Sequence, residues 1–217
     1  DHLVKRFKDD IVLNDISLSF EGGKIHGLIG RNGSGKTMLL KTICGFVPAT
    51  SGSVSVDGKV IGKDTDIPDN TGIIIEAPGF LPQYSGYKNL KLLAMIKDKI
   101  SKDKIISSIE QVGLDPYSKK RVGKYSLGMR QRLGLAQAIM EDPDLLLLDE
   151  PMNGLDNDGV CEIRQLLQEL KEEGKTIILA SHSKEDIEVL CDTVTELDHG
   201  VVISVLTRDN SKTGKQP

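Results

Sequence analysis

The feature that most constrains this sequence is a complete P-loop pattern, Gly30-Arg31-Asn32-Gly33-Ser34-Gly35-Lys36-Thr37. It lies between an apolar run at 25–29, which we expect to be a buried strand, and a helical segment at 36–44 that Gly45 is placed to end. Glycines let the backbone curl so that successive N–H groups point at phosphate oxygens, and the following helix adds its unpaired N–H groups. This setting disfavours the alternative, a glycine-rich turn that matches by chance.

Two side chains of the loop predict its ligands. Lys36 places a positive charge where the β- and γ-phosphates of a nucleoside triphosphate would lie, and Thr37 offers a hydroxyl group as a ligand for Mg²⁺. We therefore expect the chain to bind ATP together with Mg²⁺, with the loop residues 31–37 surrounding the phosphates.

Two adjacent carboxylates, Asp149 and Glu150, directly follow the apolar run Leu145–Leu148. Charges at the end of a buried strand are costly unless they serve a cation or a reaction. An Asp after such a strand holds the Mg²⁺ shell in P-loop enzymes, so Asp149 is a predicted metal ligand. Glu150 is then placed to accept a proton from the attacking water. The alternative is a pair of solvated acids at a helix entry marked by Pro151, and the P-loop favours the catalytic interpretation.

Strand and helix patterns alternate along the chain. The expected strands are at 11–20, 25–29, 72–75, 145–148 and 176–180, with hairpins at 53–61 and 194–205. The expected helices are at 36–44, within 86–140, around 160–170 and at 184–191. This alternation predicts an α/β fold, a P-loop NTPase with a RecA-like core, to which an antiparallel β subdomain and an inserted α-helical subdomain are attached.

We expect one domain over residues 1–217, because no internal repeat or linker divides the chain. The core, including the β subdomain, covers about 1–78 and 135–206, and the helical subdomain covers about 79–134. Residues 207–217 are polar and are expected to form a frayed tail.

Charge and composition exclude several functions. The net charge of −4 provides no strong positive field to attract nucleic acid or an anionic membrane. The longest apolar runs are only a few residues, whereas a membrane-spanning helix needs about 20, so any membrane role is expected to come through a partner. Cys44, Cys161 and Cys191 lack the spacing of a metal or redox motif and are expected to be free thiols.

A second set of motifs resembles the ABC ATPase family. The run Tyr125-Ser126-Leu127-Gly128-Met129 resembles the family signature, usually written LSGGQ, and a helix follows it. Asn153-Gly154-Leu155-Asp156 looks like the D-loop, and Ser181-His182-Ser183 looks like the switch histidine after a buried strand. Phe7 lies upstream of the P-loop, where the family stacks an aromatic ring on adenine. The motifs follow the family order and span nearly the whole chain.

The resemblance implies a head-to-tail dimer of this chain with a second copy of itself or with a homologous ATPase subunit. Each ATP then lies between the P-loop of one chain and the signature of the other. Ser126 and the backbone N–H of Gly128 are then expected to contact the γ-phosphate of the ATP on the partner chain, and Asp156 to couple the two sites. His182 is expected to contact the γ-phosphate. Simpler alternatives remain: Ser126 as a helix N-cap, His182 as a surface histidine, and Phe7 as part of the core.

Three positions depart from the family pattern. The signature reads Ser-Leu-Gly-Met, although Ser126 and Gly128 are kept, and Met38 stands where a second hydroxyl residue is common. Glu76 follows the strand at 72–75 where the family usually has a glutamine that touches Mg²⁺ and the attacking water, so Glu76 is a candidate catalytic and metal-binding residue. Gln83 is the alternative for this role. The run from Glu76 to Phe80 resembles the subfamily that exports bacitracin and lantibiotics.

The resemblance therefore implies the ATP-hydrolysing subunit of an exporter of antimicrobial peptides or drugs, docked on a membrane permease at the cytoplasmic face of the cell membrane. One alternative is a soluble ATPase of the same superfamily that acts on ribosomes or DNA. Ribosomal members carry two such domains and DNA-repair members a long coiled-coil insertion, and neither feature is present in these residues. A second alternative, an inactive nucleotide-binding scaffold, is disfavoured because Lys36, Asp149, Glu150 and His182 are all retained.

Overall fold

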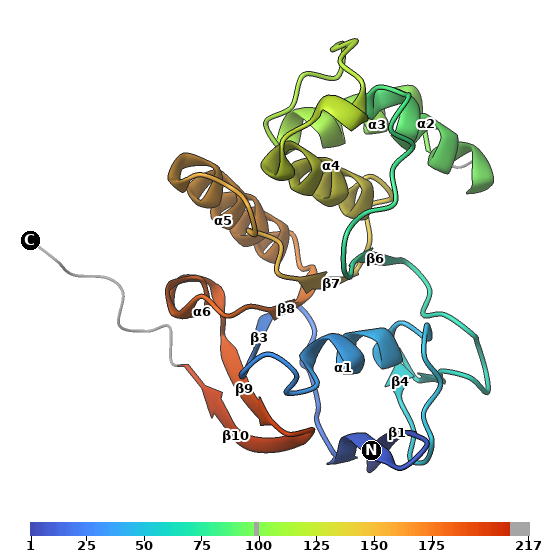
Figure 1. Cartoon of the computed structure of the whole chain (residues 1–217), viewed down its shortest axis with the longest axis vertical. Helices are drawn as coiled ribbons and strands as arrows, with labels where there is room; N and C mark the ends of the chain where they lie inside the picture. The colour runs from blue at the N-terminus through green and yellow to red at the C-terminus, as the bar shows by residue number, and fades with distance from the viewer. Residues whose placement is uncertain (98–99, 209–217) are drawn as a thin grey trace, which may run out of the picture.

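The computed structural model describes residues 1–97 and 100–208, and its centre is a six-stranded sheet (Figure 1). The strand order is β10-β9-β3-β8-β7-β6. The strands are β3 (Ile25–Ile29), β6 (Thr71–Ile74), β7 (Leu145–Asp149), β8 (Thr176–Ala180), β9 (Thr193–Asp198) and β10 (Val201–Thr207). In this sheet the four pairings that link β9, β3, β8, β7 and β6 are parallel. The pairing of β10 with β9 is antiparallel, so the sheet is mixed. The predicted parallel core and terminal hairpin are both confirmed.

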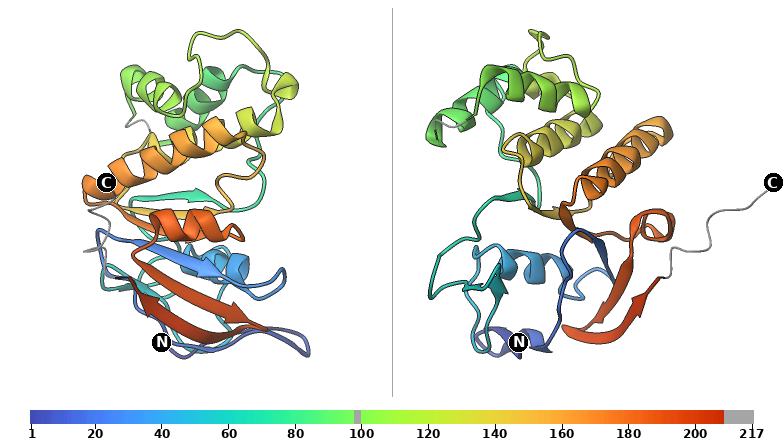
Figure 2. Two further views of the ribbon diagram at one scale, coloured as in Figure 1. Left: turned by 90° about the vertical axis from the view of Figure 1, so that its left-hand side faces the viewer. Right: turned by 180° about the vertical axis from the view of Figure 1, so that it is seen from behind.

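Apolar cores lie on both faces of this sheet, as a run such as Leu145–Leu148 predicts for a parallel strand. Successive strand residues point to opposite faces: Leu146 and Leu148 join one cluster, whereas Leu147 joins the other. Helix α1 (Lys36–Ile43) covers the face of Leu147, and α5 (Asn157–Glu172) and α6 (Lys184–Leu190) cover the other face (Figures 1 and 2).

A helical part lies at one end of the molecule, drawn at the top of Figure 1. It contains α2 (Gly86–Lys97), α3 (Lys102–Gln111), the 3₁₀ turn η1 (Val122–Lys124) and α4 (Leu127–Ile139). α4 packs against β6 and so joins this part to the sheet. The predicted division of the chain into core and helical subdomain stays a prediction, and its boundary at residue 134 falls inside α4, which is continuous across it.

Short antiparallel strands form the β part. β1 (Leu3–Phe7) pairs with β2 (Asp10–Ile16), and β4 (Ser55–Val56) pairs with β5 (Lys59–Val60). The hairpin predicted at 53–61 is confirmed, because Asp57 and Gly58 both have positive φ, as its two-residue turn requires.

The strand predicted at 11–20 was wrong at its far end, because β2 ends at Ile16. Leu18 and Phe20 still pack against the core cluster next to α1, so their alternation reflects burial without strand pairing. Strand β1 was not predicted, and its five residues mix charged and apolar side chains.

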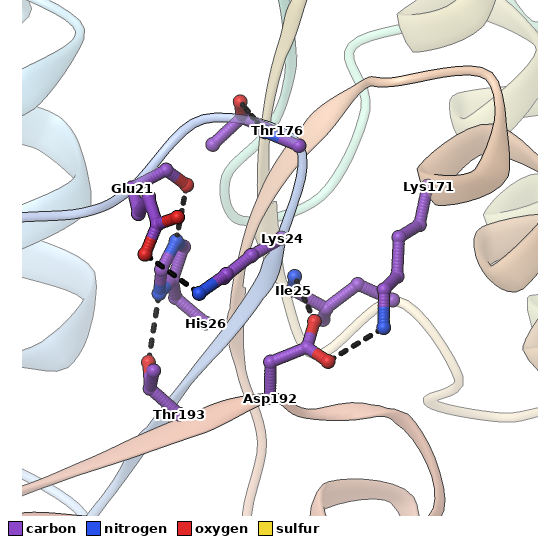
Figure 3. Close-up of polar contacts among 9 residues, drawn as sticks. Glu21, Lys24, Ile25, His26, Lys171, Thr176, Asp192 and Thr193 are labelled. Atoms are coloured by element: carbon purple, nitrogen blue, oxygen red, sulfur yellow. Dashed lines mark hydrogen bonds and ion pairs between the residues drawn. The ribbon is translucent and has the colours of Figure 1, made fainter. Parts of the chain in front are cut away.

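The amino ends of β3 and β9 are tied together by polar groups (Figure 3). Asp192 Oδ2 accepts a hydrogen bond from Ile25 N at 2.9 Å. The buried His26 ring contacts Thr193 Oγ1 through Nδ1 at 2.7 Å and the Glu21 carbonyl oxygen through Nε2 at 2.8 Å. Burial lowers the pKa of His26 below its usual value.

No helix within the described ranges 1–97 and 100–208 combines the length and the apolar character that a membrane span needs. Of the predicted tail 207–217, Thr207 is the last residue of β10, and residues 209–217 lie outside the described residues.

Candidate active site

Parallel pairing brings the candidate residues to one edge of the sheet. The P-loop follows β3, Glu150 follows β7, and His182 follows β8 by two residues. Since β3, β8 and β7 are parallel neighbours, their carboxyl ends meet at the same edge. Ligands of open parallel sheets bind at this edge. The strand order therefore assembles a site from segments more than 100 residues apart in sequence.

Glycines shape the P-loop into a cradle. Gly30, Gly33 and Gly35 have φ values of 144°, 81° and 107°, which other residues rarely adopt. A Cβ atom on Gly30 would lie 2.1 Å from the Leu197 carbonyl oxygen, so no larger residue fits there. Ser34 is 3% exposed, and among the described residues its Oγ is the one buried side-chain polar atom without a hydrogen-bond partner. An unsatisfied donor inside the cradle fits a phosphate oxygen as its partner.

Lys36 lies within this cradle with only 7% of its surface exposed. Its Nζ donates hydrogen bonds to the carbonyl oxygens of Gly30 at 2.7 Å and Arg31 at 3.2 Å. The ammonium group is thus held at the N-terminus of α1, where helix N–H groups also favour anions. The cradle and the lysine together form a complementary surface for phosphate.

The side chains of Thr37 and Asp149 meet beside the loop. Thr37 Oγ1 donates a hydrogen bond to Asp149 Oδ2 at 2.7 Å, which joins α1 to the end of β7. A hydroxyl and a carboxylate are the hard oxygen donors that suit Mg²⁺, which usually takes one or two protein ligands and completes its shell with phosphates and water. No cluster of three or more His, Cys, Asp or Glu residues placed to hold a metal occurs in the part of the chain that the structure describes. The pair therefore fits Mg²⁺ bound together with a nucleotide.

Glu150 and His182 form a direct contact, with Glu150 Oε2 2.8 Å from His182 Nδ1. Glu150 has a positive φ of 50°, and its backbone is held on both sides: its N–H donates to Ala180 O at 2.9 Å, and its carbonyl accepts from Gln131 Nε2 at 3.1 Å. A non-glycine residue at positive φ is strained and persists where its surroundings hold it in place. The carboxylate is consequently presented at a defined position beside the cradle.

Glu76 is directed to a different partner. Its Oε1 lies 2.5 Å from Nζ of Lys41, in the last turn of α1, and its side chain is 65% exposed. The structure thus brings Glu76 to the helix that follows the P-loop, and its hydrogen bond goes to Lys41 and not to Thr37 or Asp149. Gln83 is exposed in the turn before α2. The role of Glu76 or Gln83 at Mg²⁺ stays a prediction.

The signature and D-loop residues begin two helices. Ser126 Oγ caps α4 by accepting a hydrogen bond from Met129 N at 3.1 Å, and Asp156 Oδ1 caps α5 by accepting one from Gly159 N at 3.0 Å. A Cβ atom on Gly128 would lie 2.7 Å from the Gly154 carbonyl oxygen, so the two helix starts pack closely. The signature residues lie in the helical part, whereas the P-loop lies in the core.

The remaining residues that were predicted to bind the nucleotide lie at the surface or at the margin of the core. Phe7 is 46% exposed at the end of β1, with Lys5 Nζ 4.6 Å from its ring centroid. Arg31 is exposed and its Nη2 pairs with Asp198 Oδ1 at 2.9 Å, which lowers the pKa of Asp198. Asn32 is exposed at the tip of the loop, and Met38 is half-buried against the core on the α1 face.

Sequence reasoning missed two residues that support the site. Gln131 is 8% exposed and holds the backbone of Glu150, and Lys41 pairs with Glu76. Gln131 is the one polar residue among the buried residues of α4, and that exception in the helical pattern was the available signal. No such signal marks Lys41, because α1 also buries Lys36 and Thr42.

A phosphate cradle on a mostly parallel sheet of an α/β fold, with a carboxylate pair at the end of a nearby strand, defines a P-loop NTPase. A family profile described as ABC transporter matches residues 13–153. The chain therefore belongs to the ABC transporter family, as its ATP-binding and ATP-hydrolysing subunit.

Three similar sequences are named as ABC transporter or transport ATP-binding proteins. The chain is 48% identical over 199 residues to the uncharacterized ABC transporter ATP-binding protein YybJ of Bacillus subtilis (strain 168), covering 92% of this chain and 91% of that protein. It is 41% identical to the bacitracin transport ATP-binding protein BcrA of Enterococcus faecalis, covering 98% and 71%. It is 36% identical to the lantibiotic transport ATP-binding protein SrtF of Streptococcus pyogenes, covering 97% and 91%.

Among solved structures, the bacterial ABC transporter cassette MJ0796, described as a dimer, superposes with a TM-score of 0.87 at 22% identity. The match covers 96% of this chain and 97% of that one. This likeness confirms the predicted fold class.

Proposed function

We propose that this ATPase drives export of antimicrobial peptides or drugs, as a head-to-tail dimer docked on a membrane permease at the cytoplasmic face of the membrane. The relatives named for bacitracin and lantibiotic transport support the substrate class. The observation that carries the catalytic part is the convergence of the cradle, the Thr37–Asp149 pair and the Glu150–His182 pair at one sheet edge.

ATP binding relies on the loop 31–37. Its backbone N–H groups, the Ser34 hydroxyl and the Lys36 ammonium surround the β- and γ-phosphates, so Lys36 leaves its loop carbonyls for phosphate oxygens. Thr37 and Asp149 hold Mg²⁺, and Glu76 is a further candidate ligand. The metal neutralises charge on the phosphate oxygens when it is bound. Phe7 stacks on the adenine ring, and Arg31, Asn32 and Met38 flank the phosphates.

Hydrolysis relies on the Glu150–His182 pair. The Glu150 carboxylate accepts a proton from the attacking water, whose oxygen bonds to the γ-phosphorus while the bond from that phosphorus to the β–γ bridging oxygen breaks. His182 contacts the γ-phosphate and keeps Glu150 oriented. ADP and inorganic phosphate are the products. The 2.8 Å contact between the two side chains supports this division of roles.

The separation of the motifs supports the proposed dimer. The P-loop lies in the core and the signature in the helical part, so Ser126 and Gly128 reach phosphate when a second chain presents its P-loop to them. The N-terminus of α4 then offers its N–H groups to the γ-phosphate of the partner's ATP. Asp156, at the start of α5, couples the two sites across the interface.

A membrane pull-down tests the transport role. A tagged chain, purified from detergent-solubilised membranes, is expected to retain a protein with several membrane spans and to hydrolyse ATP faster with it than alone. Deletion of the chain is expected to increase sensitivity of the cells to bacitracin or a lantibiotic. Co-purification with ribosomes or DNA, and none with a membrane protein, would support the soluble alternative instead.

A further inference from the structure

Arg164, two turns into α5, joins this helix to the start of α6 through its whole guanidinium group. Its Nε and Nη2 donate to Asp186 Oδ1 at 2.9 and 2.5 Å, and its Nη1 donates to Glu185 Oε1 at 2.9 Å. The Arg164 side chain is 13% exposed and that of Asp186 is 6% exposed. Because a shielded pair loses the hydration of both charges, it requires several well-placed hydrogen bonds, and the planar guanidinium fork supplies them.

The start of α6 carries the predicted switch histidine. Ser183 Oγ caps α6 by accepting a hydrogen bond from Asp186 N at 3.2 Å. His182 directly precedes this cap and reaches Glu150 at 2.8 Å. Asp186 is therefore fixed to the turn that holds His182 through its backbone, and to Arg164 through its carboxylate.

The ion pair and the catalytic pair share one cleft. A cleft of about 530 Å³ is lined by Glu150 and His182 together with Arg164 and Asp186. Asp156 caps α5, so the helix that carries Arg164 begins at the D-loop. A continuous set of contacts thus runs from the D-loop helix to the side chain that contacts Glu150.

We propose that Arg164 is a positioning residue for ATP hydrolysis, which fixes the start of α6 so that His182 stays within reach of Glu150. This inference rests on the proposed function, in which those two residues act on the γ-phosphate and the attacking water. Arg164 itself touches neither. It acts through Asp186, and because α5 begins at the D-loop, the same contact passes a displacement of the D-loop to His182.

A second ion pair on the same helix provides a matched control (Figure 3). Lys171 Nζ lies 2.6 Å from Asp192 Oδ1, with side chains 22% and 12% exposed, and this pair joins α5 to the segment after α6. Asp192 directly precedes β9, at the amino ends of the parallel strands. The Lys171–Asp192 pair therefore lies at the edge of the sheet opposite the catalytic residues. Like the Arg164–Asp186 pair, it ties α5 to the α6 region.

The first measurement compares binding with turnover in Arg164→Lys, which keeps the charge and removes the fork. Affinity for ATP is expected to stay within about twofold, because no P-loop contact changes. The turnover number is expected to fall on the order of 10- to 100-fold, since displacing a reacting group by roughly 1 Å can cost about 100-fold. Lys171→Met is expected to keep the wild-type turnover number. Asp186→Asn tests the same contact if Arg164→Lys does not fold.

The second measurement combines Arg164→Lys with His182→Ala in a double-mutant cycle under single-turnover conditions. Residues that act as a unit are not additive, so Arg164→Lys is expected to cost less than about twofold when His182 is already absent. An equal loss in both backgrounds, or no loss in the wild-type background, overturns this inference alone. Wild-type turnover in both His182→Ala and Glu150→Gln overturns the proposed function and this inference with it.

Discussion

His182 Nδ1 and Glu150 Oε2 lie 2.8 Å apart, although 32 positions of sequence separate the residues and each follows a different strand. The contact exists because β7 and β8 are parallel neighbours, with Asp149 paired to Ala180 at their carboxyl ends. The His182 side chain is 70% exposed and that of Glu150 is 28% exposed, so solvent reaches both groups.

Lys36→Ala is expected to remove most of the stabilisation that Mg²⁺·ATP gives the fold. For the wild type, ligand at 100 times its dissociation constant adds about 2.7 kcal/mol to the free energy of unfolding. The variant loses the charge that balances the phosphates, so its melting temperature should barely change with ATP. Lys59→Ala, an exposed lysine on the β4–β5 hairpin, is the control and should respond like the wild type. Equal shifts in both variants would count against the P-loop assignment.

Glu150→Gln is expected to keep ATP binding and to lose turnover, because the amide has nearly the same shape but cannot accept the proton. The change also removes a negative charge beside the γ-phosphate, so an ATP-bound dimer should accumulate on size-exclusion chromatography. Glu169→Gln, on the exposed side of α5, should hydrolyse ATP normally and stay monomeric. Full hydrolysis by Glu150→Gln would contradict its role as general base.

Glu76→Ala is expected to reduce stimulation of ATP hydrolysis by the permease more than it reduces basal hydrolysis. The side chain stands where the chain leaves β6 for the helical part, and it contacts Lys41 of the P-loop helix, so it joins nucleotide-binding and helical segments. Glu76→Gln should be mild, because an amide oxygen can replace the carboxylate oxygen as a ligand. ATPase rates with and without the reconstituted permease measure the effect. If the alanine variant is stimulated as strongly as the wild type, Gln83 becomes the candidate to test.

Gly128→Ala is expected to lower both stability and turnover. Its new Cβ atom would lie 2.7 Å from the Gly154 carbonyl oxygen and 3.3 Å from Leu155 Cδ2, which forces the start of α4 away from the D-loop. Overpacking of this kind costs roughly 1–3 kcal/mol. Gly22→Ala, whose nearest neighbour would be 3.8 Å away, is the control for urea unfolding and ATPase assays. Wild-type turnover in Gly128→Ala would show that this close packing has no catalytic role.

Protonation of His26 is expected to destabilise the fold in mild acid. Burial lowers the pKa of His26 in the folded protein below its unfolded value of about 6.5, so the unfolded chain binds more protons in this range. The contribution of His26 to stability is complete above about pH 6.5 and is lost as the pH falls from there towards the folded pKa. Urea unfolding at several pH values should show a steeper loss for the wild type than for His26→Gln. Equal slopes for the wild type and His26→Gln would contradict this prediction.

Local sequence determined most of the elements. The apolar runs before the P-loop and before Asp149 specify strands that are buried on both faces, and glycines such as Gly45 and Gly113 end helices where predicted, both with positive φ. The prediction failed for β2, where alternation of apolar residues continued past Ile16 because those side chains pack on the core without pairing. Period-two burial and strand pairing cannot be told apart from one sequence.

Tertiary structure decided which of the predicted residues meet. The motifs identify Glu150, His182 and Glu76 as candidates, but only the order of the parallel strands places His182 against Glu150, and only the path after β6 brings Glu76 to Lys41. The Arg164–Asp186 pair has no motif at all, because it arises where α5 and α6 pack on the same face of the sheet. Local patterns encode backbone preference and burial, whereas contacts between distant segments depend on strand order and helix packing, which are properties of the whole chain.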